Sequence, residues 1–255
     1  MPDAAQLAAS IQACRPRNDY PGCGAAVEVG EPFEMSVSDR RDRAGARIRC
    51  RRPQRPHPAG TPSVAIVRGV LDRLWTAATR HPFLDAVREG TITDSAFDRW
   101  LGQDALFVGD LLTFQARLLA RAPRPAQTVL AGGCVALVAE LDWFEVQAAR
   151  RGIDLGQPAL PATLAYGELL GRLDAAPYEA AVTALWVLER VYLLAWASAA
   201  SMSTSPFGEF VEHWTAPDFA GYVDALGELA ILDGHDELVG DVLSHEVAFW
   251  DMAVV

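Results

Sequence analysis

From about residue 63 to the end of the chain, apolar side chains recur every three or four positions. This spacing places them on one face of an α-helix. The first such stripe is formed by Val67, Val70, Leu71, Leu74 and Trp75. No window shows the strict alternation of apolar and polar residues that is typical of a half-buried strand. The pattern therefore predicts an all-α domain.

Proline, glycine and capping residues divide this region into separate helices. Pro161 is expected to open a helix at its first position, where its missing N–H needs no partner. Thr93 or Asp94 is expected to cap the start of another helix, and Gly152 to close a third. The predicted helices cover 64–79, a short turn at 84–89, about 94–122, 126–151, a stretch that opens at Pro161, 178–200, 207–214, 219–232 and 235–253. We predict a bundle of about seven or eight helices.

The segment 178–200 is nearly all apolar over roughly twenty residues, which is long enough to cross a bilayer. Glu189 and Arg190 lie at its centre, where each charge would cost about 2.5–3.5 kcal/mol in a membrane. The flanking helices are amphipathic. A central core helix is therefore favoured, and no membrane contact is predicted.

Three carboxylic acids, Asp104, Glu189 and Glu246, occupy apolar faces of their predicted helices. Each has apolar or aromatic residues one turn before it and one turn after it, as Glu246 has with Leu243 and Trp250. An ionised carboxylate buried without partners costs several kcal/mol, so such a group shifts its pKa or finds a hydrogen-bond donor. Three buried acids on three helices predict a polar pocket inside the core. Unconnected structural hydrogen bonds are the alternative.

Metal and haem chemistry suit such a pocket poorly. A di-metal carboxylate site usually needs Glu-x-x-His pairs on two helices, and the chain contains none. Asp241 and His245 could pair, but one pair is weak support. A haem needs an axial ligand, and the candidate histidines at 81, 213, 235 and 245 lie at helix ends or beside charges. We therefore expect no metal and no cofactor, and a small basic organic ligand that the carboxylates bind and protonate, with aromatic rings stacked on it.

Residues 1–62 differ in composition from the rest of the chain. They carry ten arginines and seven acids, a net charge of +3 within a chain of net charge −11, so the remainder carries −14. In the Arg- and Pro-rich stretch 38–62, apolar residues do not recur at helix or strand spacing. This stretch cannot bury enough apolar surface to offset the conformational entropy that it would lose on folding. A basic nucleic-acid arm and a targeting peptide are the functional alternatives. We expect a disordered extension or an upstream reading frame included by a misplaced start codon.

Targeting and nucleic-acid binding are disfavoured by the same composition. A secretory signal has an apolar core behind a charged start, and a transit peptide is poor in acids; residues 1–62 fit neither description. The strongly acidic remainder is unsuited to contacts with phosphate, so no nucleic-acid partner is expected. We predict a cytoplasmic protein.

Two blocks of motifs resemble the TenA family, also called thiaminase II. The first block consists of HPF at 81–83, GTI at 90–92, Phe97, Trp100, QD at 103–104 and Phe107, and the second is HEVAFWDMA at 245–253. The resemblance covers residues 63–255. It implies the haem-oxygenase-like all-α fold without bound haem, a role in thiamin salvage, and a homo-oligomer, either a dimer or a tetramer.

One branch of that family uses a cysteine nucleophile in its long central helix. The matching position here is Ala184. Cys134 lies on another helix, and we interpret it as a small core residue. The chain instead resembles the cysteine-less branch, TenA_E, in the segments 140–145, 184–192 and 210–214. That resemblance implies removal of the formyl group from an N-formyl aminomethyl pyrimidine, or hydrolysis of the free amine. Cleavage of intact thiamin is disfavoured without the thiol.

The resemblance also suggests roles for individual residues. Asp104 could pair with the ring nitrogen and exocyclic amine of an aminopyrimidine through two parallel hydrogen bonds. Phe107 could stack on the ring, and the Tyr166 hydroxyl could bond the ring or the leaving group. Glu246 is the candidate general acid/base, because burial should raise its pKa toward working pH. Glu189 is the candidate that orients or deprotonates a water in place of the cysteine.

Alternative interpretations remain for two residues and for the function as a whole. Trp186 and Tyr192 are either ligand contacts or core residues. A cofactorless oxidase of the same fold, like the enzyme that completes pyrroloquinoline quinone, should be rich in His and Arg, and this region is acidic. A non-catalytic pyrimidine carrier would need Asp104 and Phe107 but could dispense with Glu189 and Glu246.

Overall fold

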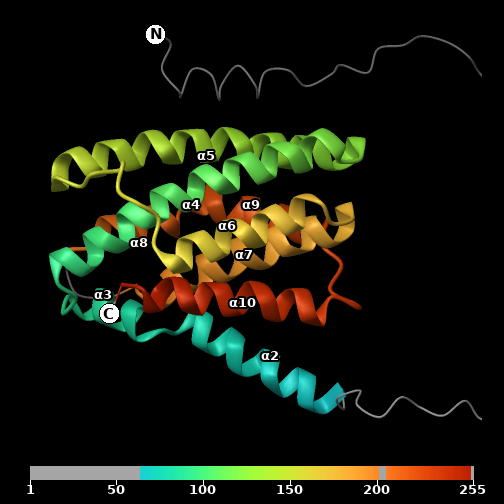
Figure 1. Ribbon diagram of the computed structural model, residues 1–255, viewed down its shortest axis with the longest axis horizontal. Coiled ribbons are helices and arrows are strands. Elements are labelled where there is room, and N and C mark those ends of the chain that lie inside the picture. The colour runs from blue at the N-terminus through green and yellow to red at the C-terminus, as the bar shows by residue number, and fades with distance from the viewer. Residues whose placement is uncertain (1–63, 201–204, 254–255) are drawn as a thin grey trace, which may run out of the picture. The chain divides into compact units, whose positions relative to one another are not determined.

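The computed structural model describes residues 64–200 and 205–253, all within the unit His57–Val255. These residues form helices and connecting turns, with no strand among them, which confirms the all-α prediction (Figure 1). The expectations for residues 1–62 lie outside the described ranges. The helices are α2 (Val64–Thr79), α3 (Pro82–Glu89), α4 (Asp94–Arg121), α5 (Arg124–Arg151), α6 (Pro161–Asp174), α7 (Tyr178–Ser198), α8 (Gly208–Trp214), α9 (Pro217–Gly227) and α10 (Asp236–Asp251).

Local chemistry accounts for most helix ends. The His81 side chain accepts a hydrogen bond from the Phe83 N–H and so caps α3, which begins at Pro82, two residues before the predicted turn. The Thr93 side chain accepts from the Ala96 N–H at the start of α4. Gly152 closes α5 with a φ of 74°, a left-handed conformation that glycine adopts without strain.

Helix α9 is shorter than the pattern predicted, because it ends at Gly227 instead of continuing to 232. The reason is a tertiary contact with α7. The Thr183 hydroxyl of α7 donates to the Ile231 carbonyl and accepts from the Ile231 N–H at 2.9 Å. These bonds satisfy the backbone that would otherwise continue the helix.

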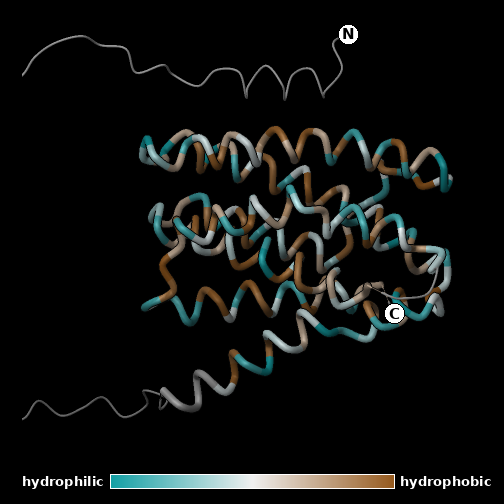
Figure 2. The backbone as a smooth tube through the Cα atoms, turned by 180° about the vertical axis from the view of Figure 1, so that it is seen from behind, coloured by the Kyte–Doolittle hydropathy of each residue, from teal (hydrophilic) through white to brown (hydrophobic). Residues whose placement is uncertain are grey.

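Helix α7 is the central element of the bundle. It packs against α2, α3, α4, α6, α8, α9 and α10, so nearly its whole circumference is buried. Among the described residues it is the one helix long and apolar enough to cross a membrane, and 67% of its apolar window lies inside the protein. Apolar positions recur along the surrounding helices as well (Figure 2). A helix that is apolar all round is typical of such a core position.

Aromatic side chains pack together at one end of the core. Trp100 stacks on Trp250 with ring centroids 5.5 Å apart and contacts Trp196 at 5.3 Å and Phe83 at 5.2 Å. The Trp250 indole N–H donates to the Ala78 carbonyl at 3.0 Å. The conspicuous HPF and FW motifs thus join α2, α3, α4, α7 and α10 into one core.

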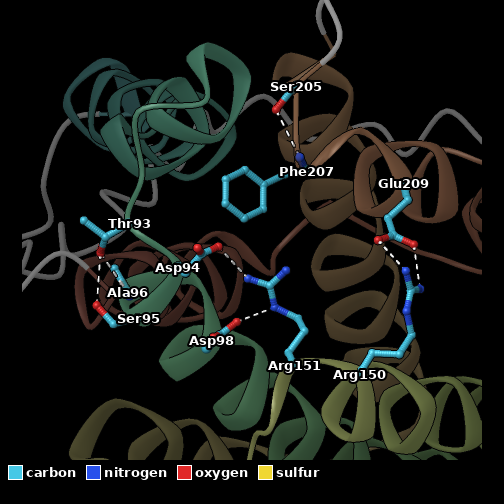
Figure 3. A network of polar contacts seen from close by, with 10 residues as sticks. All are labelled: Thr93, Asp94, Ser95, Ala96, Asp98, Arg150, Arg151, Ser205, Phe207 and Glu209. Carbon is cyan, nitrogen blue, oxygen red and sulfur yellow. Dashed lines mark hydrogen bonds and ion pairs between the residues drawn. The ribbon is translucent and has the colours of Figure 1, made fainter.

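Arg151, at the end of α5, connects three parts of the chain (Figure 3). Its guanidinium bonds to Asp98 and, at 3.0 Å, to Asp94, both in the first turns of α4. The same group lies over the rings of Phe207 and Phe210, 5.7 Å from each centroid. This cluster fixes the start of α8, the short helix that carries two residues of the cavity described below.

Candidate active site

A cavity of about 520 Å³ lies among α4, α5, α7, α8 and α9. Its walls are mostly apolar and aromatic, with a few polar groups, which is typical of a small-molecule site. His213 is the one basic side chain among the described residues that line it. The polar and aromatic lining residues are Asp104, Phe107, Glu140, Trp143, Glu189, Tyr192, His213, Trp214, Asp218, Phe219 and Tyr222.

Asp104 of α4 faces this cavity and is almost fully buried, with 1% of its surface exposed. Its carboxyl accepts a hydrogen bond from the Tyr192 hydroxyl of α7 at 2.8 Å. Burial raises the pKa of Asp104 well above its usual range, and the acids Glu140, Glu246 and Glu189 reinforce the rise, while the Tyr192 bond opposes it. A carboxyl in this state can both donate and accept hydrogen bonds.

The neighbouring Gln103 is buried too, but it has a structural role. Its amide nitrogen donates to the Pro158 carbonyl at 3.1 Å, and its oxygen accepts from the Leu160 N–H and the Thr163 hydroxyl, both at 2.7 Å. Gln103 therefore ties the loop before α6 to α4. Gln103 and Asp104 therefore have different roles, Gln103 in holding the loop and Asp104 in facing the cavity, because successive residues of a helix point in different directions.

Glu189 of α7 lies on the cavity wall with 6% of its surface exposed. Within the described part of the chain, no side chain or backbone group hydrogen-bonds to its carboxyl. Burial raises its pKa to about 8, and the negative charges of Glu246 and Glu140 add to the rise. A buried carboxyl of this kind is available to a water or a ligand in the cavity.

Glu246 of α10 and Tyr166 of α6 form a buried pair in the layer next to the cavity. The Tyr166 hydroxyl donates to the Glu246 carboxyl, and the Tyr166 ring lies 4.5 Å from that of Phe107, which lines the cavity. Burial raises the pKa of Glu246 to about 7, and the Tyr166 bond opposes this rise. Burial and Glu246 together raise the pKa of Tyr166, so its hydroxyl keeps the proton that it donates.

The three acids predicted to be buried are therefore buried, on α4, α7 and α10. Two of them influence the ionisation of another: Glu246 raises the pKa of both Asp104 and Glu189, and Glu189 raises that of Asp104. Tyr192 also lies at the site, through its bond to Asp104. The structure thus brings together the acids and aromatic residues singled out in the sequence, apart from Trp186.

Trp186 lies away from the cavity lining. It packs against α9 at Gly227, where a Cβ would approach the Trp186 indole nitrogen to 3.0 Å. Ala184 is buried and does not line the cavity. Cys134 is absent from the lining as well, and partial burial raises the pKa of its thiol, which lowers the fraction of reactive thiolate. Within the described ranges, no three His, Cys, Asp or Glu side chains gather in an arrangement that could hold a metal ion.

Seven of the polar and aromatic lining residues were not predicted as substrate-site residues: Asp218, Phe219 and Tyr222 of α9, and four residues in segments that the resemblance had pointed to. Glu140 and Trp143 come from α5, and His213 and Trp214 from α8. Both oxygens of Glu140 accept from α8: one from His213 Nε2 at 2.7 Å and the other from the Trp214 indole N–H at 2.8 Å. The three-residue spacing of Glu140 and Trp143 was the available signal, because it places both on one helix face.

Comparison with known proteins agrees with this architecture. The model of the TENA/THI-4/PQQC family matches residues 70–254. A soybean (Glycine max) protein named "Probable bifunctional TENA-E protein" is 33% identical over 202 residues, which cover 71% of this chain and 88% of the soybean protein.

Solved structures show the same fold. A TenA homologue from Pyrococcus furiosus superposes with a TM-score of 0.67 at 29% identity, covering 74% of this chain and 98% of its own. A TenA-family protein from Silicibacter sp., named a transcription regulator, has a TM-score of 0.68 at 19% identity and covers 75% of this chain and 96% of its own. At that identity it shows the fold alone. The family model spans most of the chain, and the chain therefore belongs to the TENA/THI-4/PQQC family.

Proposed function

We propose that the protein is a hydrolase of thiamin salvage that acts on degraded thiamin pyrimidines. Its substrates are the N-formyl aminomethyl pyrimidine, the free aminomethyl pyrimidine, or both. The observation that carries this proposal is Glu189, a buried carboxyl on the cavity wall with a pKa near 8. The name of the soybean relative supports the cysteine-less branch of the family.

Substrate recognition begins at Asp104. A carboxyl group can meet the edge of an aminopyrimidine with two hydrogen bonds, one to the ring nitrogen and one from the exocyclic amine. Because burial favours the protonated form of Asp104, this carboxyl can donate to the ring nitrogen and accept from the amine. Tyr192 holds the carboxyl in place, and Phe107 offers its ring face to the pyrimidine.

Hydrolysis then needs an activated water and a protonated leaving group. Glu189 takes a proton from a water, and the water oxygen adds to the formyl carbon while the carbonyl electron pair moves onto its oxygen. The carbon–nitrogen bond then breaks, its electron pair stays on nitrogen, and Glu246, which lies next to the cavity, supplies the proton for that nitrogen through the Tyr166 hydroxyl. The products are the aminomethyl pyrimidine and formic acid. With the free amine, the water oxygen displaces the amine at the methylene carbon: the carbon–oxygen bond forms as the carbon–nitrogen bond breaks, and the electron pair leaves on nitrogen. The protonated nitrogen departs as ammonia, and the other product is the hydroxymethyl pyrimidine.

The direct test is an assay of the purified chain against the N-formyl compound, the free amine and thiamin, with the products resolved by chromatography. We expect turnover of one or both of the first two compounds and none of thiamin. Thiamin cleavage would mean that a thiol supplies the nucleophile. No turnover, with pyrimidine binding retained, would favour a carrier.

A matched pair of variants assigns the binding site. Asp104→Ala should weaken pyrimidine binding at least about tenfold, because it removes hydrogen bonds made to a polar group in a buried site. Asp110→Ala removes an acid of the same helix that is exposed and lies outside the cavity. It should leave affinity unchanged. Equal affinities for both variants, measured by calorimetry, would show that Asp104 does not hold the ring.

A further inference from the structure

The imidazole of His213 is held in one orientation by two neighbours from α5. Its ring stacks on Trp143 with centroids 3.9 Å apart and an interplanar angle of 4°. Its Nε2 lies 2.7 Å from a carboxyl oxygen of Glu140. The second Glu140 oxygen is occupied by the Trp214 indole N–H, so the carboxyl cannot rotate without breaking a bond.

This arrangement leaves one polar atom of the ring for the cavity. An ionised carboxylate only accepts hydrogen bonds, so the proton between the two groups belongs to Nε2. Nδ1 has no hydrogen-bond partner among the described residues, and His213 lines the cavity with 31% of its side chain exposed. Stacking on the Trp143 face also stabilises a charged imidazolium. The stack on Trp143 and the contact with Glu140 both favour the doubly protonated ring, in which Nδ1–H is the donor toward the cavity.

The charge of this donor sets it apart from the rest of the site. The other ionisable groups of the lining include Asp104, Glu140, Glu189 and Asp218, which all are acids. None of them can give a positively charged hydrogen-bond donor to a carbonyl oxygen. His213 can, and the developing charge on that oxygen during water addition would strengthen the bond.

We propose that His213, oriented by Glu140 and Trp143, recognises the formyl group of the substrate through Nδ1–H and thereby sets the preference for the formyl compound over the free amine. This inference rests on the proposed function. The free amine, an ammonium near neutral pH, has no lone pair that could accept a hydrogen bond from Nδ1–H. The formamide is neutral and offers a carbonyl oxygen. Glu140 is a positioning residue, because it acts through His213.

The test compares the two substrates within each variant. His213→Phe keeps an aromatic ring against Trp143 and removes both nitrogens. We expect kcat/KM for the formyl compound to fall at least tenfold, a typical loss for a hydrogen bond to a charged group. The value for the free amine should stay within about threefold or rise. Glu140→Gln should also lower the ratio of kcat/KM for the formyl compound to kcat/KM for the free amine, but by a smaller factor.

Two controls separate this effect from a general loss of structure. Glu212→Gln changes an exposed acid of α8 next to His213, outside the cavity, and should keep the wild-type ratio. Affinity for the hydroxymethyl pyrimidine, which has no formyl group, should be the same in all variants. If His213 or Glu140 had a merely structural role, its variant would lower kcat/KM for both substrates together and would also weaken binding of the hydroxymethyl pyrimidine.

The outcomes are distinguishable from a failure of the proposed function. A wild-type protein that turns over neither compound overturns both proposals. A wild-type protein that prefers the formyl compound, with His213→Phe keeping that preference, overturns the role of His213 alone. If His213→Phe does not fold, the same kcat/KM ratio is measured for His213→Gln, and an unchanged preference for the formyl compound again overturns the role of His213.

Discussion

At the scale of single residues, burial separates acids that composition alone treats alike. The chain has 33 acidic residues, and within the described part Asp104, Glu189 and Glu246 are the acids with less than a tenth of their surface exposed. Burial raises the pKa of Glu189 to about 8 and that of Glu246 to about 7. Both values lie near working pH, where proton transfer by a side chain is most effective.

Glu189→Gln tests the proposed general base. We expect turnover of the preferred substrate to fall by about 10²–10⁴, the usual contribution of such a group. Because the reaction needs ionised Glu189, with a pKa of about 8, and protonated Glu246, with a pKa of about 7, the wild-type rate should rise up to about pH 7, level off, and fall above about pH 8. That rising limb should be missing from the variant. A variant that keeps both its rate and its rising limb contradicts the assignment. Asp110→Asn is the control.

Glu246→Gln tests the proposed general acid. The variant should lose the decline of the rate at high pH, because that decline comes from an acid that must keep its proton, along with about 10²–10⁴ in rate. The rate of this variant should then rise until it levels off at the pKa of Glu189, which should lie below about 8, since Glu246 is one of the charges that raise it. The two pKa values obtained from the pH–rate profile belong to the interacting pair of Glu189 and Glu246 and not to either residue alone. An unshifted profile with an unchanged rate would falsify this role.

At the scale of elements, the cavity depends on where α8 lies. This helix has only seven residues and is too short to be stable by itself. Arg151 fixes its start through Phe207 and Phe210, and Glu140 bonds to its His213 and Trp214. Its position is therefore set by contacts with α5 and α4.

Arg151→Met should destabilise the protein by about 1.5–3 kcal/mol, because it breaks hydrogen bonds between charged groups with only 19% of the Arg151 side chain exposed. Arg150→Met is a matched control from the adjacent position. It removes a pair with Glu209 whose side chains are 57% and 47% exposed, and should cost less than about 1 kcal/mol. Urea denaturation measures both values. Equal losses for the two variants would show that Arg151 does not fix α8.

At the scale of the whole molecule, the buried acids link stability to pH. Each has a folded-state pKa above its unfolded value, so the folded protein binds protons more tightly than the unfolded chain. Their contribution to stability is complete below the unfolded value near 4.5 and is lost as pH rises through the folded value, about 8 for Glu189.

Glu189→Gln should therefore change the melting temperature in a pH-dependent way. Near pH 5 we expect little difference from the wild type, because Glu189 is protonated in the folded protein. Near pH 8.5 the variant should melt several degrees higher, since it removes a buried charge; 1 kcal/mol corresponds to about 2–4 °C for a chain of this size. Glu168→Gln, an exposed acid of α6, should melt like the wild type at both pH values. Calorimetry provides the comparison, and a pH-independent difference would contradict the linkage.

The pattern of apolar and polar positions was sufficient for the fold class, for most helix boundaries and for the burial of Asp104, Glu189 and Glu246. These features depend on which face of each helix turns inward, and the 3.6-residue period encodes that face directly. The prediction for α9 was wrong because Thr183, 48 residues earlier, bonds the backbone of Ile231 and ends the helix.

Partnerships between helices were decided only by tertiary packing. Tyr192 and Asp104 are 88 residues apart, Tyr166 and Glu246 are 80 apart, and His213 and Glu140 are 73 apart. Helical periodicity says that a side chain faces the core, but the crossing of two helices selects the residue it meets there. By itself, therefore, the sequence determined which acids are buried. The packed bundle decided which hydroxyl bonds to Asp104 and which to Glu246, placed Trp186 away from the cavity, and brought His213 to its wall.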